Sequence, residues 1–198
     1  MLDVAAIPEA VGYYLAGFVD GEGSFNVSFR PRSDYVFPWK VSLCFNVSQR
    51  DPLVLRVLQT QLRCGTMRQR GDGVWYFEVN TLANVIQNVI PFFERFGFLS
   101  AKKQRDFAKF VQLASLLRSG RHLTRQGVIE ILRIRFDMND GGKRRYLDEE
   151  ILERFENPQR PYARQPRQRS MIWSDLHGDM QSAAEMAVPL PLFERGQE

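Results

Sequence analysis

Asp20 and Glu22 are two carboxylates placed two residues apart in a short glycine-rich segment, Asp20-Gly21-Glu22-Gly23. The residues before them have the apolar spacing of a helix, and glycine just past the last turn commonly ends one. Acids are unfavourable at this place, because the last carbonyl groups of a helix already carry partial negative charge. Free carbonyl oxygens and a carboxylate together suit a hard divalent cation such as Mg²⁺. A capped helix followed by two solvated acids is the alternative that these residues leave open.

The helix that must position these acids carries small residues on one side. Two adjoining ridges at a spacing of four residues hold Tyr13, Gly17 and Gly21, and Gly12, Ala16 and Asp20. Each glycine inside a helix costs about 1 kcal/mol relative to alanine, so several of them need a structural reason. Small residues four apart allow two helix backbones to approach closely. We therefore expect this side of the helix to contact another helix through Tyr13, Ala16, Gly17 and Asp20.

The nine residues from Leu15 to Gly23 resemble the LAGLIDADG motif of homing endonucleases, position for position. The resemblance implies that the motif helix forms the interface between two halves of a DNA-cutting enzyme. It also implies that Glu22, at the penultimate acidic position, binds a catalytic metal, Mg²⁺ or Mn²⁺, together with the carbonyl of Gly21. Many family members carry Asp at this position, and Glu is a known variant.

Residues 24–30 and 40–48 alternate apolar and polar side chains, which predicts two half-buried strands joined by a loop at 31–38. The polar positions carry amides, hydroxyls and bases, with no acid between Ser24 and Arg32. Such groups match the donors and acceptors of base edges in the major groove, which admits a two-stranded ribbon. An ordinary solvated sheet face is the alternative. The DNA-contacting residues predicted here are Ser24, Asn26, Ser28, Arg30, Arg32, Lys40, Ser42 and Asn46.

A second hairpin is predicted to open at Cys64-Gly65 and to turn at Gly71-Asp72-Gly73. Arg68 and Arg70 lie two apart on one side of its first strand, where they could hold guanine edges or phosphates. Exposed arginines on an edge hairpin are the alternative. The predicted DNA-contacting face also contains Tyr76 and Glu78 from the last strand.

The remaining pattern is helical. Helices are expected over 52–62, from Asn80 or Thr81 to an interruption at Pro91, from Ser100 to Leu117, from Thr124 to about Met138, and near 148–156. With the strands they give the order αββαββα and an α+β fold, in which an antiparallel four-stranded sheet is followed by extra C-terminal helices. This is the topology that the resemblance implies for a single LAGLIDADG core.

Two further active-site residues are assigned through the resemblance. Gln49 resembles a peripheral amide that holds solvent near the scissile phosphate, and a polar residue at a strand end is the alternative. Lysine in a first helical turn is unfavourable against the helix dipole, so an anion near Lys102 or Lys103 would stabilise that turn. Lys103 matches the family's active-site base by register, and Lys102 is the alternative. The basic run Lys143–Arg145 is predicted to contact the DNA backbone.

The chain has 198 residues, a net charge of +4, two cysteines and two histidines. Two cysteines give no disulfide framework and fit a reducing compartment, and two histidines are too few for a zinc nuclease site. The sequence has no run of about 18 apolar residues, and its first residues lack the basic and then apolar pattern of a secretory signal peptide. We expect a soluble intracellular protein, in a bacterial cytoplasm or an organelle, without membrane contact. Residues 1–156 are expected to form one domain, and the Pro- and Arg-rich residues 157–198 an extended tail.

A single copy of the motif predicts a homodimer, in which two small-residue helices bring both Glu22 carboxylates together. A homodimer implies a near-palindromic duplex target, because protein and site share the two-fold symmetry. The resulting hypothesis is a site-specific endonuclease that makes a metal-dependent double-strand cut in DNA. A non-cleaving relative that binds nucleic acid, such as an intron RNA maturase, is the alternative, and the acid at position 22 favours the endonuclease.

Overall fold

The computed structural model describes residues 1–32, 37–139 and 145–156, so the predictions for Lys143, Arg144 and the tail 157–198 lie outside the described residues. The elements in chain order are η1 (Val4–Ala6), α1 (Glu9–Glu22), β1 (Gly23–Pro31), β2 (Trp39–Gln49), α2 (Pro52–Leu62), β3 (Thr66–Gln69), β4 (Trp75–Val79), α3 (Leu82–Asn84), η2 (Val85–Val89), α4 (Ile90–Phe96), α5 (Ala101–Arg118), η3 (Arg121–Leu123), α6 (Arg125–Phe136) and α7 (Asp148–Glu156). The predicted order αββαββα and the α+β class are confirmed when α3, η2 and α4 are counted as one helix. Within the described ranges, every helix is too short or too polar to cross a membrane.

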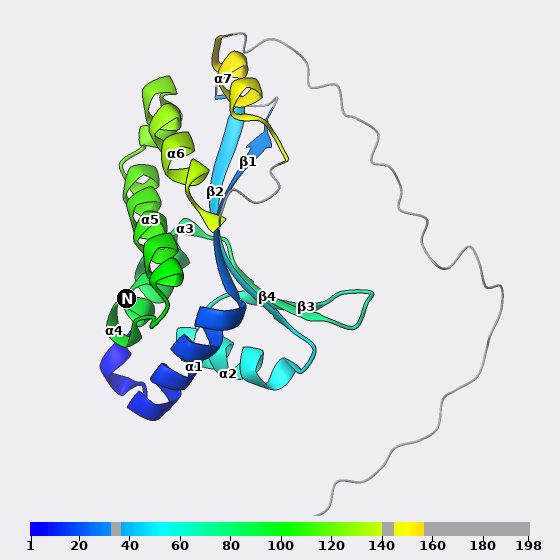
Figure 1. Cartoon of the computed structure of the whole chain (residues 1–198), viewed down its shortest axis with the longest axis vertical. Coiled ribbons are helices and arrows are strands. Elements are labelled where there is room, and N and C mark those ends of the chain that lie inside the picture. The colour runs from blue at the N-terminus through cyan, green and yellow to red at the C-terminus, as the bar shows by residue number, and fades with distance from the viewer. Residues whose placement is uncertain (33–36, 140–144, 157–198) are drawn as a thin grey trace, which may run out of the picture. The chain divides into compact units, whose positions relative to one another are not determined.

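The four strands form one antiparallel sheet in the order β1-β2-β4-β3 (Figure 1). Gly23 pairs with Val47 and Pro31 with Trp39, so Pro31 belongs to β1 and the first loop is shorter than predicted. Proline is tolerated here because it lies at the end of an edge strand, where a missing N–H does not break the sheet. The predicted turn between β3 and β4 is also present.

One face of the sheet packs against α1, α2 and α5 (Figure 1). Phe25 of β1 stacks on Phe45 of β2 with ring centroids 5.3 Å apart, and its centroid lies 4.9 Å from that of Phe110 in α5. All three rings are fully buried, and aromatic rings of this kind contribute much of the apolar area that a core removes from water. The apolar side of the predicted alternation is therefore the core side of the sheet. We call the opposite, polar side the open face.

The helix around Pro91 differs from the prediction, because it is not interrupted. α3 continues through the π-helical η2 directly into α4. Proline has no N–H, and its ring crowds the carbonyl four residues earlier, so the wider π turn lets the helix continue past it. That carbonyl belongs to Gln87, and the backbone N–H of Leu2 donates to it (2.7 Å). A group far away in the sequence thus supplies the hydrogen bond that Pro91 cannot make.

The predicted helix starts at Asp51, Ser100 and Thr124 are confirmed. Each side chain accepts a hydrogen bond from a backbone N–H in the first turn of α2, α5 or α6, at 2.8, 3.2 and 3.1 Å. Such caps satisfy N–H groups that have no partner inside the helix. α6 ends at Phe136, slightly before the expected Met138.

The C-terminal helices pack on the β1–β2 hairpin. The indole Nε1 of Trp39 donates to the carbonyl of Ile151 in α7 (3.0 Å), and the Ile151 side chain is fully buried. The guanidinium of Arg135 in α6 lies over the Phe29 ring, 5.3 Å from its centroid, and 3.5 Å from the Asp148 carboxylate. These contacts hold α6 and α7 close to the β1 edge of the sheet.

The inner side of α1 packs against α4 of the same chain. A Cβ atom on Gly12 would lie 2.2 Å from the Phe96 ring, and Ala16 is only 3% exposed. Both residues belong to the ridge that was expected to meet another helix. The structure differs for Ala16, which was expected at the interface with a second copy, because its side chain is buried in this chain's own core.

Gly12→Ala is expected to lower the free energy of unfolding by about 1–3 kcal/mol, since the new methyl group must displace the buried Phe96 ring. Ser115→Ala, at an exposed position of α5, is the control and should change stability by less than about 0.5 kcal/mol. Chemical denaturation of both variants measures the difference. An unchanged or raised stability for Gly12→Ala would show that α4 moves freely away from α1.

Candidate cleavage site and nucleic-acid interface

α1 ends beside the start of α5, and the carboxylate of Asp20 joins the two. It accepts hydrogen bonds from the backbone N–H groups of Leu99 (3.1 Å) and Ser100 (2.9 Å), and from the Ser100 hydroxyl. Burial works to raise the pKa of Asp20, but the bonds from Ser100 and Leu99 and the charge of Lys103 outweigh it and lower that pKa. Asp20 thus has a structural role in this chain, at a place that we call the α1–α5 junction.

Lys103 reaches back from the first turn of α5 to the first residue of β1. Its Nζ donates to the carbonyl of Gly23, and the side chain is half-buried. Burial lowers the pKa of Lys103, and the carboxylates of Asp20, Asp106 and Glu22 oppose that shift. Of the two candidate lysines, Lys103 is the one that the fold brings to the end of α1.

Glu22 is the last residue of α1 and is exposed. Gly21 before it is open, with no heavy atom within 4 Å of the place where a Cβ would lie. In the described part of the chain, no group of three or more His, Cys, Asp or Glu side chains could hold a metal. One carboxylate beside open backbone still fits Mg²⁺, which keeps several waters and binds through one or two carboxylates and substrate phosphates. Glu22 and the carbonyl of Gly21 are the groups that could hold such an ion here.

Gln49 is the last residue of β2, two residues beyond Val47, which pairs with the first residue of β1. It therefore lies at the end of the sheet where α1 joins β1. Its Oε1 accepts a hydrogen bond from the Arg50 backbone N–H (2.8 Å). Among the described residues no hydrogen bond joins Gln49 to Glu22 or Lys103, and its role near the scissile phosphate stays a prediction.

The open face carries the polar residues that were predicted to contact DNA. Cross-strand pairing arranges them in the rows Ser24–Asn46–Glu78, Asn26–Cys44, Ser28–Ser42 and Arg30–Lys40. Arg30 and Lys40 are exposed, and the others are half-buried. Arg32 follows the end of β1, where its backbone N–H donates to the Pro38 carbonyl (2.8 Å). The face therefore presents amides and hydroxyls at its centre and bases at the far end of the β1–β2 hairpin.

Arg68 is held over the open face by two neighbours from β4. Its guanidinium lies 4.8 Å from the Tyr76 ring centroid and 3.9 Å from the Glu78 carboxylate. Burial, together with the nearby charges, raises the pKa of Tyr76 to about 12, so its hydroxyl stays protonated. β3 ends at Gln69, and Arg70 follows it at the turn, where its backbone N–H donates to the Val74 carbonyl (2.8 Å) and its guanidinium lies 3.3 Å from the Asp72 carboxylate.

The outer side of α1 faces away from the core. Tyr13 and Tyr14 are 52% and 59% exposed. Gly17 is exposed, and nothing lies within 4 Å of the place where its Cβ would be. Tyr13, Gly17 and Gly21 thus form an exposed strip of small residues bordered by tyrosine, which we call the outer strip of α1.

Comparison with known proteins shows what this arrangement belongs to. Residues 15–114 match the family model described as LAGLIDADG endonuclease. This chain belongs to the LAGLIDADG endonuclease family. The resemblance of Leu15–Gly23 to the family motif is thereby confirmed, and so is the predicted fold.

Three LAGLIDADG relatives give the extent of the likeness. DNA endonuclease I-CreI of Chlamydomonas reinhardtii is 36% identical over 83 residues, which cover 40% of this chain and about half (51%) of that protein. The homing endonuclease I-TnaI superposes with a TM-score of 0.63 at 30% identity, over 74% of this chain and 96% of that chain. The I-LtrWI LAGLIDADG homing endonuclease bound to target DNA superposes with a TM-score of 0.64 at 27% identity, over 68% of this chain and 46% of that chain.

Several residues on the open face of this LAGLIDADG core were not among the predicted contacts. Cys44, Ser48 and Thr66 share it, because Cys44 pairs with Asn26 in the register and the other two alternate with core positions. Alternation within each strand was a sufficient signal for these three. Asn139, which bonds to the side of β1, had no local signal at all.

Asp20→Asn is expected to lower the free energy of unfolding by about 1–3 kcal/mol, because it removes a charged acceptor from the α1–α5 junction. Glu22→Gln makes the same chemical change two residues later, at an exposed carboxylate, and should alter stability by less than about 0.5 kcal/mol. Chemical denaturation at neutral pH compares the two. Equal losses would argue against the structural role given to Asp20.

Proposed function

We propose that this chain is a site-specific DNA endonuclease that acts as a homodimer and makes a metal-dependent double-strand cut in a long near-palindromic duplex. The observation that carries the proposal is the exposed Glu22 at the end of the motif helix, with Lys103 held beside it. Relatives in the same family are named DNA endonucleases, and I-LtrWI is described as bound to target DNA. The family and the intact acid together favour cleavage over binding alone.

The number of LAGLIDADG cores supports the homodimer. This chain covers nearly the whole of the I-TnaI chain but less than half of the I-LtrWI chain. The region matched here therefore corresponds to one core, about half of the longer I-LtrWI chain. One core supplies one Glu22 and one open face. Two copies packed through the outer strip of α1 about a two-fold axis would place both Glu22 carboxylates side by side. Tyr13 and Gly17 are the contacts proposed for that interface, with Asp20 at its edge.

DNA would lie along the open face. A two-stranded ribbon fits the major groove, where amides and hydroxyls can read base edges and arginines can read guanine. Asn26, Asn46 and Arg68 are the strongest candidates for base contacts by side-chain type. Arg30, Lys40 and Arg70 are exposed bases suited to phosphates, which carry most of the salt-dependent affinity. The remaining proposed contacts are Ser24, Ser28, Arg32, Ser42, Tyr76 and Glu78.

Hydrolysis of a phosphodiester would use the residues at the α1–α5 junction. A bound Mg²⁺ or Mn²⁺ would supply a water of lowered pKa and stabilise charge on the phosphate. Glu22 and the Gly21 carbonyl would hold the ion. Lys103 would stabilise negative charge that develops near the scissile bond, and Gln49 would orient solvent at the periphery. Asp20 would keep Lys103 and Glu22 in register through its bonds to α5.

The two cysteines bear on the compartment in which the protein works. Cys44 and Cys64 are both free thiols, and burial raises the pKa of Cys64 to about 11, so this thiol stays protonated and poorly reactive. We propose that the protein works in a reducing intracellular compartment. We also propose intron RNA as a further ligand of the same polar face.

Glu22→Gln should abolish cleavage while leaving DNA binding within about threefold of wild type, because only the metal ligand changes. The target is first selected from a randomised duplex library in Ca²⁺, which supports binding without cutting. Recovered duplexes are then incubated in Mg²⁺ with wild type and with Glu22→Gln. A long near-palindrome that only the wild type cuts is the expected result.

Two other outcomes are informative. Selected duplexes that neither protein cuts would leave a DNA-binding relative without nuclease activity and would direct attention to RNA. Cleavage by both proteins would show that Glu22 is not needed for the cut.

Lys103→Ala should slow cleavage, because the side chain of Lys103 reaches Gly23 beside Glu22. Lys102→Ala is the matched control and should cut at the wild-type rate.

Gly17→Leu should make the protein monomeric without unfolding it. The side chain enters open space in a single chain, and leucine is about 1 kcal/mol better than glycine in a helix, so the isolated chain should be slightly more stable. A close helix contact would be blocked. Sedimentation of the variant measures the mass, with the exposed α5 substitution Gln112→Leu as the control. A dimer that survives Gly17→Leu would place the interface elsewhere.

A further inference from the structure

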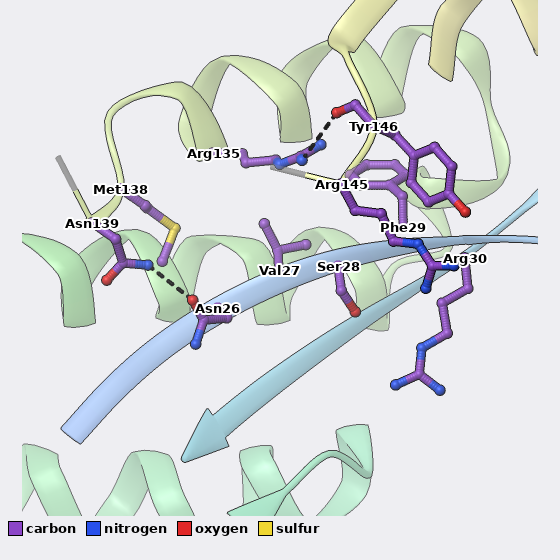
Figure 2. A pocket seen from close by; sticks show the side chains of 10 residues that line it. All are labelled: Asn26, Val27, Ser28, Phe29, Arg30, Arg135, Met138, Asn139, Arg145 and Tyr146. Carbon is purple, nitrogen blue, oxygen red and sulfur yellow. Dashed lines mark hydrogen bonds between the residues drawn. The ribbon is translucent and has the colours of Figure 1, made fainter. Parts of the chain in front are cut away.

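A pocket of about 360 Å³ lies at the outer edge of β1, where the end of α6 and the residues before α7 approach the strand (Figure 2). Its polar lining includes residues from both sides. The open-face residues Asn26, Ser28 and Arg30 come from β1, whereas Asn139 follows α6 and Arg145 precedes α7. Asn139 and Arg145 therefore lie beside residues that are proposed to contact DNA, although neither belongs to the sheet.

Asn139 makes the connection. Its Nδ2 donates both to the backbone carbonyl of Phe25 (2.8 Å) and to the side-chain Oδ1 of Asn26 (3.1 Å), the second of which is drawn in Figure 2. The orientation of the Asn139 amide is unambiguous, because a backbone carbonyl can only accept. Asn26 must therefore present its oxygen to Asn139.

The backbone of Asn139 is fixed as well. Its φ of +53° lies in the left-handed region, which Asn adopts more readily than most residues. Its N–H donates to Oδ1 of Asp106 (3.3 Å), a carboxylate that is only 6% exposed in α5. Asn139 is thus held between α5 and the edge of β1, and its side-chain amide cannot turn without losing both of its bonds to β1.

The consequence falls on Asn26. Its Oδ1 accepts from Asn139, and its Nδ2 donates to the Ser24 hydroxyl (3.0 Å). An amide nitrogen has two hydrogens, so one N–H of Asn26 remains for a ligand. Bidentate recognition of adenine requires the oxygen and the nitrogen of the amide to face the base together, and the bond to Asn139 opposes that geometry.

We propose that Asn139 determines the base preference of Asn26 from outside the sheet, by holding its oxygen and leaving an N–H to face the major groove. This inference rests on the proposed DNA-reading role of the open face. An N–H donor favours a base-edge acceptor, which is N7 or O6 of guanine, N7 of adenine or O4 of thymine. Asn139 itself touches no base and is a positioning residue.

The test compares wild type with Asn139→Asp, Asn139→Gly and Asn26→Ala in the full-length chain. Aspartate has the shape of asparagine and tolerates the same backbone, but it cannot donate. It therefore loses the bond to the Phe25 carbonyl, and Asn26 should turn its amide and donate to the new carboxylate. The oxygen of Asn26 would then face the groove and favour the N6 amino group of adenine or the N4 amino group of cytosine. Glycine also keeps the backbone but releases the Asn26 amide, so discrimination should weaken without reversing.

Binding in Ca²⁺ and cleavage in Mg²⁺ are measured on duplexes that differ from the selected target by one base pair in each half-site. Asn26→Ala identifies the position that this residue reads. At that position Asn139→Asp should shift the preference from acceptor-bearing to donor-bearing bases by about tenfold, about 1.4 kcal/mol, and leave the other positions unchanged. Melting temperatures confirm that the variants are folded. A purely structural role of Asn139 would lower the melting temperature and weaken binding to all duplexes, without changing the preference at one position.

The outcomes separate the inference from the function on which it rests. If wild type selects no duplex, the proposed function fails and the inference with it. If wild type selects and cuts a target but Asn139→Asp and Asn139→Gly keep the wild-type preference at the Asn26 position, the inference alone is overturned. Losses spread evenly over all positions would also overturn it, since they indicate a weakened fold.

Discussion

The hydrogen bonds that Asp20 accepts from the start of α5 fix the geometry on which the proposed cleavage site depends. They join positions 80 residues apart in the chain, and from this junction Lys103 reaches Gly23 and lies beside Glu22. An acid at the end of α1 is unfavourable in isolation, because it meets the negative end of that helix dipole. The positive end of the α5 dipole and the Ser100 hydroxyl stabilise the Asp20 carboxylate and outweigh that unfavourable interaction. Charge-assisted hydrogen bonds of this kind are stronger than neutral ones. The two acids of the motif therefore have different physical roles: one is bonded inside the chain and the other is left exposed.

The motif helix must satisfy two packing demands at once. Gly12 and Ala16 allow α4 to lie close on the inside, while Gly17 and Gly21 leave the outside open. Each of these glycines lowers helix propensity. Tyr13 of the outer strip packs against Phe96 of the same chain, but no heavy atom lies within 4 Å of the place where a Cβ of Gly17 or Gly21 would be. These two glycines have no packing role in one protomer, which is the physical argument for a second copy. In the proposed dimer the same helix would carry Glu22 to the two-fold axis, and association and metal binding would be linked through its orientation.

Prediction from sequence succeeded where the determining forces are local. Alternating side chains define the β1–β2 hairpin, and Asp51, Ser100 and Thr124 begin their helices through bonds within one turn. It was wrong where a distant group decides the outcome. The helix passes Pro91, and the distant N–H of Leu2 bonds to the Gln87 carbonyl. The small ridge of α1 lies against Phe96 of the same chain at Gly12. Neither contact leaves a local pattern. Of the site, the positions of Lys103 and the open-face residues followed from register, whereas the bridge from Asp106 through Asn139 to Asn26 joins three segments that no periodicity relates.

The polar groups of the open face are held before any DNA arrives. Arg68 lies over Tyr76 and near Glu78, and Asn26 is bonded on both sides. Side chains ordered in advance lose less entropy on binding, so their contacts discriminate between bases more sharply than those of free side chains. In the proposed complex Glu78 would work against affinity, since it would place negative charge near the phosphates. It lies 3.9 Å from the guanidinium of Arg68, so it would also penalise duplexes that leave that arginine without a base partner. The acid and the amide bridge would then act in the same sense: both would restrict the duplexes that the sheet accepts, and both would favour a narrow set of duplexes over tight binding to any duplex.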